Sequence, residues 1–169
     1  MNLELVEIIV SFFSGLPHWL ATIFISTLPI FELRGAIPVA IGIYHINPLK
    51  AYLLAVAGNA LPVIPLLLYL GPVSNFLRRY RYWDRFFEWL FTRAHHTHSE
   101  SFERYGTIAL ALFVAVPLPV TGAWTGCAAA FVLGIRFRHA LAAIMTGILI
   151  AGIIVTTITV GADTILSSI

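Results

Sequence analysis

Long apolar stretches dominate the pattern along the chain, and they are broken mainly at proline and glycine. No charged residue occurs within residues 51–77 or within residues 105–135. A helix needs about 20 apolar residues to cross the hydrocarbon core of a bilayer. The stretches 49–70 and 139–162 reach that length, so we predict a membrane-spanning helix in each.

Shorter apolar pieces flank loops that contain proline. Residues 16–28 stop at Pro29, and residues 35–45 form a second short piece that ends in the sequence HINPLK. Both pieces are too short to cross the core, so we interpret them as two half-length helices of a re-entrant hairpin. Residues 105–135 repeat this order around the sequence PLPVTG, which predicts a second hairpin.

Glycine and proline also divide the rest of the apolar pattern. A glycine and a proline at the junction of residues 3–15 with residues 18–28 favour a separate interfacial helix over residues 3–15. The alternative is that the two segments form one kinked span. Inside the first span, Pro62 and Pro65 predict kinks of the kind that membrane helices tolerate. We predict that Gly71-Pro72 ends this helix.

Residues 74–93 have an amphipathic pattern instead. Aromatic and apolar residues recur at helical spacing on one face, and arginines recur on the other, which predicts a helix lying on a membrane surface. A solvated helix packed on its own protein is the alternative. The few arginines and the one-sided aromatics argue against a nucleic-acid partner. The two faces are Phe76, Tyr80, Trp83, Phe87 and Leu90, and Arg78, Arg81, Arg85, Glu88 and Thr92.

The two halves of the chain match at an offset of 87 residues. Gly35-Ala36 then falls on Gly122-Ala123, and Leu54-Ala55 falls on Leu141-Ala142. Each half consists of a broken hairpin followed by a spanning helix. The predicted fold is therefore an all-α integral membrane protein with one domain over residues 1–169. It comprises repeat one at about 16–71, an amphipathic cytoplasmic connector at 72–104 and repeat two at about 105–162.

Composition supports the membrane class. The chain is 59% hydrophobic and 11% charged, with a mean hydropathy of +0.90, whereas a soluble domain carries about 25% charge. The first residues include Glu4 and Glu7 and no base, so no cleaved signal is expected. The single cysteine, Cys127, excludes an internal disulfide and a cysteine metal cluster.

Charge bias predicts the topology. If residues 72–104 are cytoplasmic and both hairpins return to the side that they entered from, residues 134–139 are also cytoplasmic and residues 45–50 are outside. The outside segment then carries Lys50 alone, which fits the positive-inside rule and makes the two halves inverted. The eight arginines on the inside would be Arg78, Arg79, Arg81, Arg85, Arg93, Arg104, Arg136 and Arg138.

The charged pair Glu32 and Arg34 is the main candidate for chemistry. No other charge occurs between Glu7 and Lys50, and charges at membrane depth are costly and usually functional. Arginine can bind a phosphate or carboxylate through two parallel hydrogen bonds. Because burial generally raises the pKa of a carboxylate, Glu32 is the candidate proton acceptor. The alternative is a pair that only stabilises a broken helix.

The remaining candidate substrate-binding residues are uncharged. The loop of the second predicted hairpin, called the second tip below, contains Thr121 and also Trp124, which is a platform for the substrate or a packing residue. The N–H groups after Gly122 stand at the start of a helix, which favours anions. Gly35 and Gly122 would permit close backbone approach. Asn59 is a polar residue in the middle of the first predicted span. The alternative to substrate binding is a hydrogen bond from its amide to another helix. Thr146 is its counterpart at the same offset.

The other motifs of the sequence do not favour an enzyme or a metal site. The sequence RAHHTHSE at 93–100 contains three histidines, and a solvated turn is the favoured interpretation over a metal site or a pH sensor. No GxSxG, HExxH, P-loop or GxGxxG motif occurs. We therefore expect no enzyme activity, no cofactor and no metal.

The sequences FELRGAIPVAIG and VPLPVTGAWTGCAAA resemble the small multidrug export protein family, and through it the wider DedA-like group. The resemblance covers nearly the whole chain. It implies two re-entrant hairpins in inverted halves, with Glu32 and Arg34 matching the first-tip pattern. DedA-like proteins typically carry an arginine near the second tip, where Thr121 and Trp124 stand here. For some of them the implied substrate is undecaprenyl phosphate.

The resulting hypothesis is a multi-pass transporter of the cytoplasmic membrane. It would move an anionic polyprenyl-phosphate-type lipid, with protons coupled through Glu32, and a homodimer is plausible because few elements surround the site. Proton-coupled export of small hydrophobic or cationic drugs is one alternative, although Arg34 would repel cations. The other is a membrane scaffold or a lipid-phosphate enzyme. The expected partners are membrane lipids, the substrate and protons.

Overall fold

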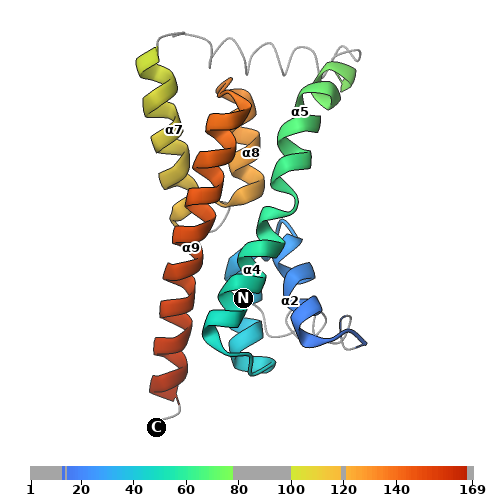
Figure 1. The fold of residues 1–169 in the computed structure, drawn as a ribbon, viewed down its shortest axis with the longest axis vertical. Helices are drawn as coiled ribbons and strands as arrows, with labels where there is room; N and C mark the ends of the chain where they lie inside the picture. Colours follow the sequence, from blue (N-terminus) through green and yellow to red (C-terminus); the bar gives the residue numbers. More distant parts are fainter. Residues whose placement is uncertain (1–12, 14, 78–99, 119–120, 167–169) are drawn as a thin grey trace. The chain divides into compact units, whose positions relative to one another are not determined.

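Helices make up all the regular structure in the described part of the chain. The computed structural model describes residues 13, 15–77, 100–118 and 121–166, and the prediction of an all-helical protein is confirmed for these residues (Figure 1). The surface helix predicted over 74–93 lies outside them beyond residue 77, as does the histidine segment. The interfacial helix predicted over 3–15 also lies almost wholly outside them.

The described residues fall into two compact units. The first consists of residues up to 61 together with residues from 148 onward, and the second consists of residues 62–147. Helix α9, Phe137–Leu166, therefore contributes its first part to the second unit and its remainder to the first. These units divide the chain at other positions than the repeats predicted above.

The first unit begins with helix α2, His18–Thr27. It ends at Leu28, which has an extended backbone with φ −72° and ψ 135°, because the residue before a proline avoids the helical region. The predicted stop at Pro29 is thus confirmed. Since Pro17 stands at the N-cap, α2 is a helix with its own start.

The second half of the first hairpin differs from the prediction. Helix α3 runs over Glu32–Pro38 and continues directly as the π-helix η1, Val39–Ile43. Glu32 and Arg34 therefore lie in the first turn of a helix, and the connecting loop is shorter than predicted. Pro38 does not end the helical segment. The backbone widens after it, where the N–H of Tyr44 donates to the carbonyl of Val39 five residues back, at 3.0 Å.

The first predicted span is two helices in the structure. Helix α4 covers Pro48–Ala60, with the Asn47 side chain accepting a hydrogen bond from the N–H of Leu49 at 3.0 Å. A turn at Leu61 and Pro62 follows, and helix α5 covers Val63–Leu77. The predicted interruption at Pro62 is confirmed. The predicted end at Gly71-Pro72 is wrong, because α5 accommodates Pro72 in its interior.

The second unit also contains two helices in the region predicted to form the second hairpin. Helix α7 covers Glu100–Ala115 and helix α8 covers Ala123–Val132. The N–H of Gly134 donates to the carbonyl of Phe131, and the N–H of Ile135 donates to that of Ala130, which closes α8 as a Schellman motif. Gly134 has a φ of +65°, which glycine adopts without strain.

Small residues form much of the helix contact in the first unit. Ala21, Ala36, Ala51 and Ala55 are fully buried. A Cβ atom at Gly58 would overlap the backbone carbonyl of Ile23, so α2 and α4 approach at backbone distance there. Close packing through small residues is typical of membrane helices, where lipid removes the hydrophobic drive for association.

Large apolar side chains are correspondingly exposed. Two helical segments, Pro48–Val73 and Phe137–Ile165, are long and apolar enough to cross a membrane. Exposed leucines and isoleucines on this scale favour contact with lipid over contact with water. They include Ile30, Leu49, Leu53, Leu61, Ile64, Leu68, Leu112, Ile153 and Ile158.

Candidate functional site

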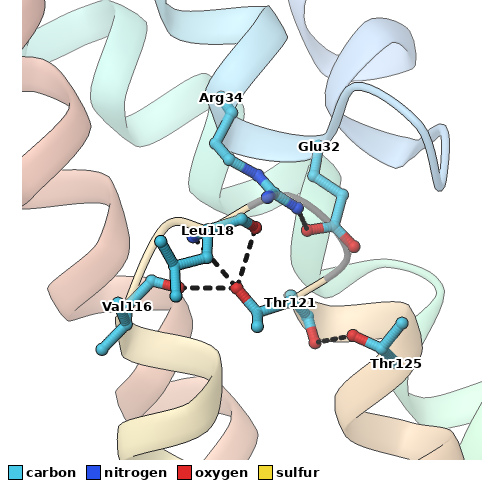
Figure 2. A network of polar contacts seen from close by, with 7 residues as sticks. Glu32, Arg34, Val116, Leu118, Thr121 and Thr125 are labelled. Carbon is cyan, nitrogen blue, oxygen red and sulfur yellow. Dashed lines mark hydrogen bonds and ion pairs between the residues drawn. The ribbon is translucent and has the colours of Figure 1, made fainter.

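The ion pair of Glu32 and Arg34 is the centre of the candidate site. The Nη2 atom of Arg34 lies 3.5 Å from Oε2 of Glu32, at the start of α3 (Figure 2). Residues two apart do not face each other on a regular helix. The contact is possible because Glu32 has a φ of +44°, outside the helical region, which turns its side chain toward Arg34.

The loop before α3 fixes this unusual backbone. The N–H groups of Phe31 and Glu32 both donate to the carbonyl of Leu28, at 3.3 and 3.0 Å. A non-glycine residue at positive φ is strained, and such strain tends to occur at functional sites. The sequence gives no sign of the positive φ, since the residue there is neither glycine nor asparagine.

The two members of the pair differ in exposure. The Glu32 side chain is 5% exposed and the Arg34 side chain is 24% exposed. A buried carboxylate is tolerated when it is paired, and Arg34 is a partner of Glu32. The more accessible group of the site is therefore a guanidinium.

Gly35 serves the packing of the same turn. A Cβ atom at Gly35 would lie 2.9 Å from Cβ of Phe31 and 3.0 Å from its Cδ1, closer than atoms in ordinary contact. The absence of a side chain thus lets the first turn of α3 pack against Phe31. Its predicted role in substrate approach stays a prediction.

At the second tip, Thr121 closes its own loop. Its Oγ1 lies 2.7 Å from the carbonyl oxygen of Val116 and 2.9 Å from that of Leu118, and it accepts from the N–H of Leu118 at 3.1 Å (Figure 2). A hydroxyl has one hydrogen to donate, so these carbonyls share it. Thr121 has a local structural role, and its substrate role stays a prediction.

The start of α8 is organised around Gly122. This glycine is the N-cap residue, with φ 158° and ψ −164°, a region open almost only to glycine. Thr125 Oγ1 lies 3.3 Å from the Gly122 carbonyl. Trp124 is half-buried on the first turn, and its platform role stays a prediction.

Asn59 and its offset counterpart Thr146 have different surroundings. Asn59 is 1% exposed. Thr146 is exposed, and its hydroxyl donates to the Ala142 carbonyl of its own helix at 2.8 Å. The offset therefore pairs a buried amide with an outward threonine, and only Asn59 has the burial expected of a binding residue.

Sequence reasoning missed two polar residues at the end of α2. Ser26 Oγ donates to the Ala55 carbonyl of α4 at 2.5 Å. Thr27 Oγ1 lies 3.0 Å from the Gly58 carbonyl of α4 and 3.0 Å from the Ile23 carbonyl of its own helix, and these two carbonyls share its hydrogen. The available signal was the polar dipeptide at the end of an apolar run, directly before Leu28-Pro29.

The predicted site residues thus belong to both units. The first unit holds Glu32, Arg34, Gly35 and Asn59, and the second holds Gly122, Thr121 and Trp124. Within the described residues, no group of three or more histidine, cysteine, aspartate or glutamate side chains could hold a metal ion.

Comparison with known proteins gives one family. Residues 32–154 match the model of the small multi-drug export protein family, whose export activity is assigned only provisionally in its description. The match begins at Glu32 and covers most of the chain. Neither a curated protein nor a solved structure matches.

Proposed function

Because this chain belongs to the small multi-drug export protein family, we propose that it is a multi-pass transporter whose substrate-binding group is Arg34. The substrate that we infer is an anionic amphipathic molecule, most specifically a polyprenyl-phosphate-type lipid. The observation that carries the proposal is the asymmetric ion pair, in which the carboxylate is buried and the guanidinium is the more exposed member.

The geometry of the Glu32–Arg34 ion pair would allow a substrate anion to replace the Glu32 carboxylate at Arg34. A separation of 3.5 Å is at the upper limit of a hydrogen bond, so the Glu32 carboxylate is a weak ligand of the guanidinium. A phosphate can instead form two short, charge-assisted hydrogen bonds to arginine. We infer that the substrate displaces Glu32 from Arg34.

Proton coupling through Glu32 follows from the same exchange. Once displaced, the buried carboxylate would lose the guanidinium as its counter-ion, and removing one partner of a buried ion pair costs several kcal/mol. Uptake of a proton removes that cost. Substrate binding at Arg34 and protonation at Glu32 would then occur together, and release of the substrate would return the proton.

The architecture in this proposal is an inverted repeat of re-entrant hairpins in the cytoplasmic membrane. The repeated element order, the interrupted helices and the arginine bias support it. The resemblance to DedA-like proteins supports a lipid phosphate as the substrate. The proposal includes no enzyme activity, and phosphate release from a lipid by the purified protein would contradict it.

Binding by the purified protein tests the substrate class. We expect the wild type to bind a polyprenyl phosphate more tightly than the uncharged polyprenol. Arg34→Gln should weaken phosphate-lipid binding by about tenfold to a hundredfold, since each charge-assisted bond contributes about 1.5–3 kcal/mol. Arg138→Gln, at an exposed arginine on α9, is the matched control and should leave affinity unchanged. Equal affinity in the wild type and Arg34→Gln would refute the proposal.

Export of hydrophobic cations is the second candidate, because the family description names drug export. In that case Glu32 would bind the substrate, and Glu32→Gln would abolish tolerance of cationic dyes in cells that express the protein. Under our proposal Glu32→Gln leaves dye tolerance unchanged. It also tightens phosphate-lipid binding, because it removes the competing carboxylate.

A further inference from the structure

A buried oxygen without a partner lies in the first unit. Asn59 is 1% exposed, and its Oδ1 atom has no hydrogen-bond partner within the described part of the chain. Buried polar atoms are nearly always paired, so each exception needs a physical reason. Asn59 therefore marks a place where a further group is expected.

Two carbonyl groups of α4 that accept hydrogen bonds from α2 locate the backbone of this residue. In an α-helix the N–H of Asn59 donates to the Ala55 carbonyl, and Ser26 Oγ donates to the same carbonyl at 2.5 Å. The neighbouring Gly58 carbonyl, which is bonded covalently to the nitrogen of Asn59, accepts from Thr27 at 3.0 Å. Asn59 thus belongs to the end of α4, which the end of α2 contacts.

The oxygen atoms of this cluster have lone pairs to offer. A hydroxyl donates one hydrogen, and Ser26 directs its hydrogen to the Ala55 carbonyl, so the Ser26 oxygen has only lone pairs left to offer. The Asn59 Oδ1 atom is an acceptor as well. Pro62 lacks the N–H that would otherwise serve the Gly58 carbonyl. The carboxyl end of α4 adds a partial negative charge.

We propose that Asn59 Oδ1 and Ser26 Oγ, with carbonyl oxygens at the end of α4, bind a monovalent cation of sodium size. Neutral oxygen ligands suit a hard alkali ion, whereas divalent cations are held by carboxylates and transition metals by imidazole or thiolate. Cation binding at Asn59 is independent of the proposed transport, in which Glu32 carries the coupling proton. A buried water is the competing occupant.

Thermal unfolding of the purified protein in detergent tests the site. Tm is measured by intrinsic tryptophan fluorescence in sodium chloride, potassium chloride and choline chloride at equal ionic strength. We expect sodium to raise Tm relative to choline, by roughly 2–4 °C at about five times the dissociation constant. Equal Tm values in all three salts would show a buried water only and would overturn the proposal.

Variants assign the effect to the cluster. Asn59→Leu should abolish the sodium increment while its Tm in choline chloride stays at or above that of the wild type, because an apolar side chain replaces an unpaired polar one. Asn59→Asp should retain or enlarge the increment, and Ser26→Ala should reduce it. Thr146→Val, which removes an exposed hydroxyl at the matching offset, should keep it in full.

A sodium increment that persists in Asn59→Leu would place the ion elsewhere and contradict the proposal. If Asn59→Leu does not fold, the comparison of Ser26→Ala with Thr146→Val decides, and equal increments in those two variants overturn it. Phosphate-lipid binding by the wild type and Arg34→Gln is measured on the same preparation. Failure of the cation site is thereby distinguished from failure of the transport proposal.

Discussion

At the scale of single residues, Glu32 combines burial, charge and a backbone conformation that its type rarely adopts. Its φ of +44° orients the carboxylate toward Arg34. A residue with a Cβ atom in the left-handed region costs about 1–2 kcal/mol relative to glycine. The ion pair is thus obtained at a cost in backbone energy, which is the pattern expected where function determines the residue.

This cost can be measured by comparing two variants. Glu32→Gly and Glu32→Ala both remove the carboxylate and leave Arg34 without it, so their difference reports the backbone alone. We expect Glu32→Gly to be more stable than Glu32→Ala by about 1 kcal/mol, measured by thermal unfolding in detergent. At Leu33, which has no positive φ, the order should reverse because glycine destabilises a helix interior. Equal stability of the two Glu32 variants would show that the backbone there is unstrained.

At the scale of elements, the end of α2 stabilises the break between α4 and α5. Pro62 has no N–H for the Gly58 carbonyl. The Thr27 hydroxyl lies 3.0 Å from that carbonyl and 3.0 Å from the Ile23 carbonyl of its own helix, and it shares its hydrogen between them. The residue that interrupts one helix thus creates the acceptor that holds another. Because Thr27 precedes the loop to Glu32 directly, this bond also fixes the origin of that loop.

A double-mutant cycle tests this contact. Thr27→Val keeps the shape and removes the donor, so it should destabilise the protein by about 1 kcal/mol in chemical or thermal unfolding. Pro62→Ala supplies a backbone N–H for the Gly58 carbonyl. In that background the cost of Thr27→Val should fall to nearly zero, and the difference is the coupling energy. Additive effects of the two substitutions would mean that Thr27 does not compensate for the proline.

The sequence predicted the existence of the helices better than it predicted their ends. Pro29 ends α2 as predicted, because the restriction on the preceding residue is local. Pro38 and Pro72 instead lie inside helical segments: α3 continues after Pro38 as the π-helix η1, and α5 continues past Pro72. Such adjustments depend on neighbouring helices, which the local sequence does not specify.

Only part of the candidate site could be predicted from the sequence. Glu32 and Arg34 were conspicuous because they are isolated charges in an apolar chain. The hydroxyls of Ser26 and Thr27 were not, because serine and threonine often bond to their own helix, as Thr146 does. What separates these cases is the carbonyl of another helix within reach, which is a property of packing and not of composition.

At the scale of the whole molecule, the predicted repeat can be compared with the order of the described elements. The first series is α2, α3 with η1, and then α4 and α5 as two helices, whereas the second is α7, α8 and the single helix α9. If the positive-inside rule orients both series as predicted from the sequence, matching segments lie on opposite sides of the membrane. The topology therefore depends on whether residues 105–135 return to the side that they enter from.

Labelling of single cysteines in intact cells decides between the two topologies. The native Cys127 is first replaced by alanine, and exposed positions 50 and 138 then receive cysteine in separate variants. We expect a membrane-impermeant maleimide to label Lys50→Cys from outside and to label Arg138→Cys only after permeabilisation. Labelling of Arg138→Cys in intact cells would mean that residues 105–135 cross the membrane once. The inverted arrangement would then be wrong, because two arginines next to a span would lie outside against the charge bias.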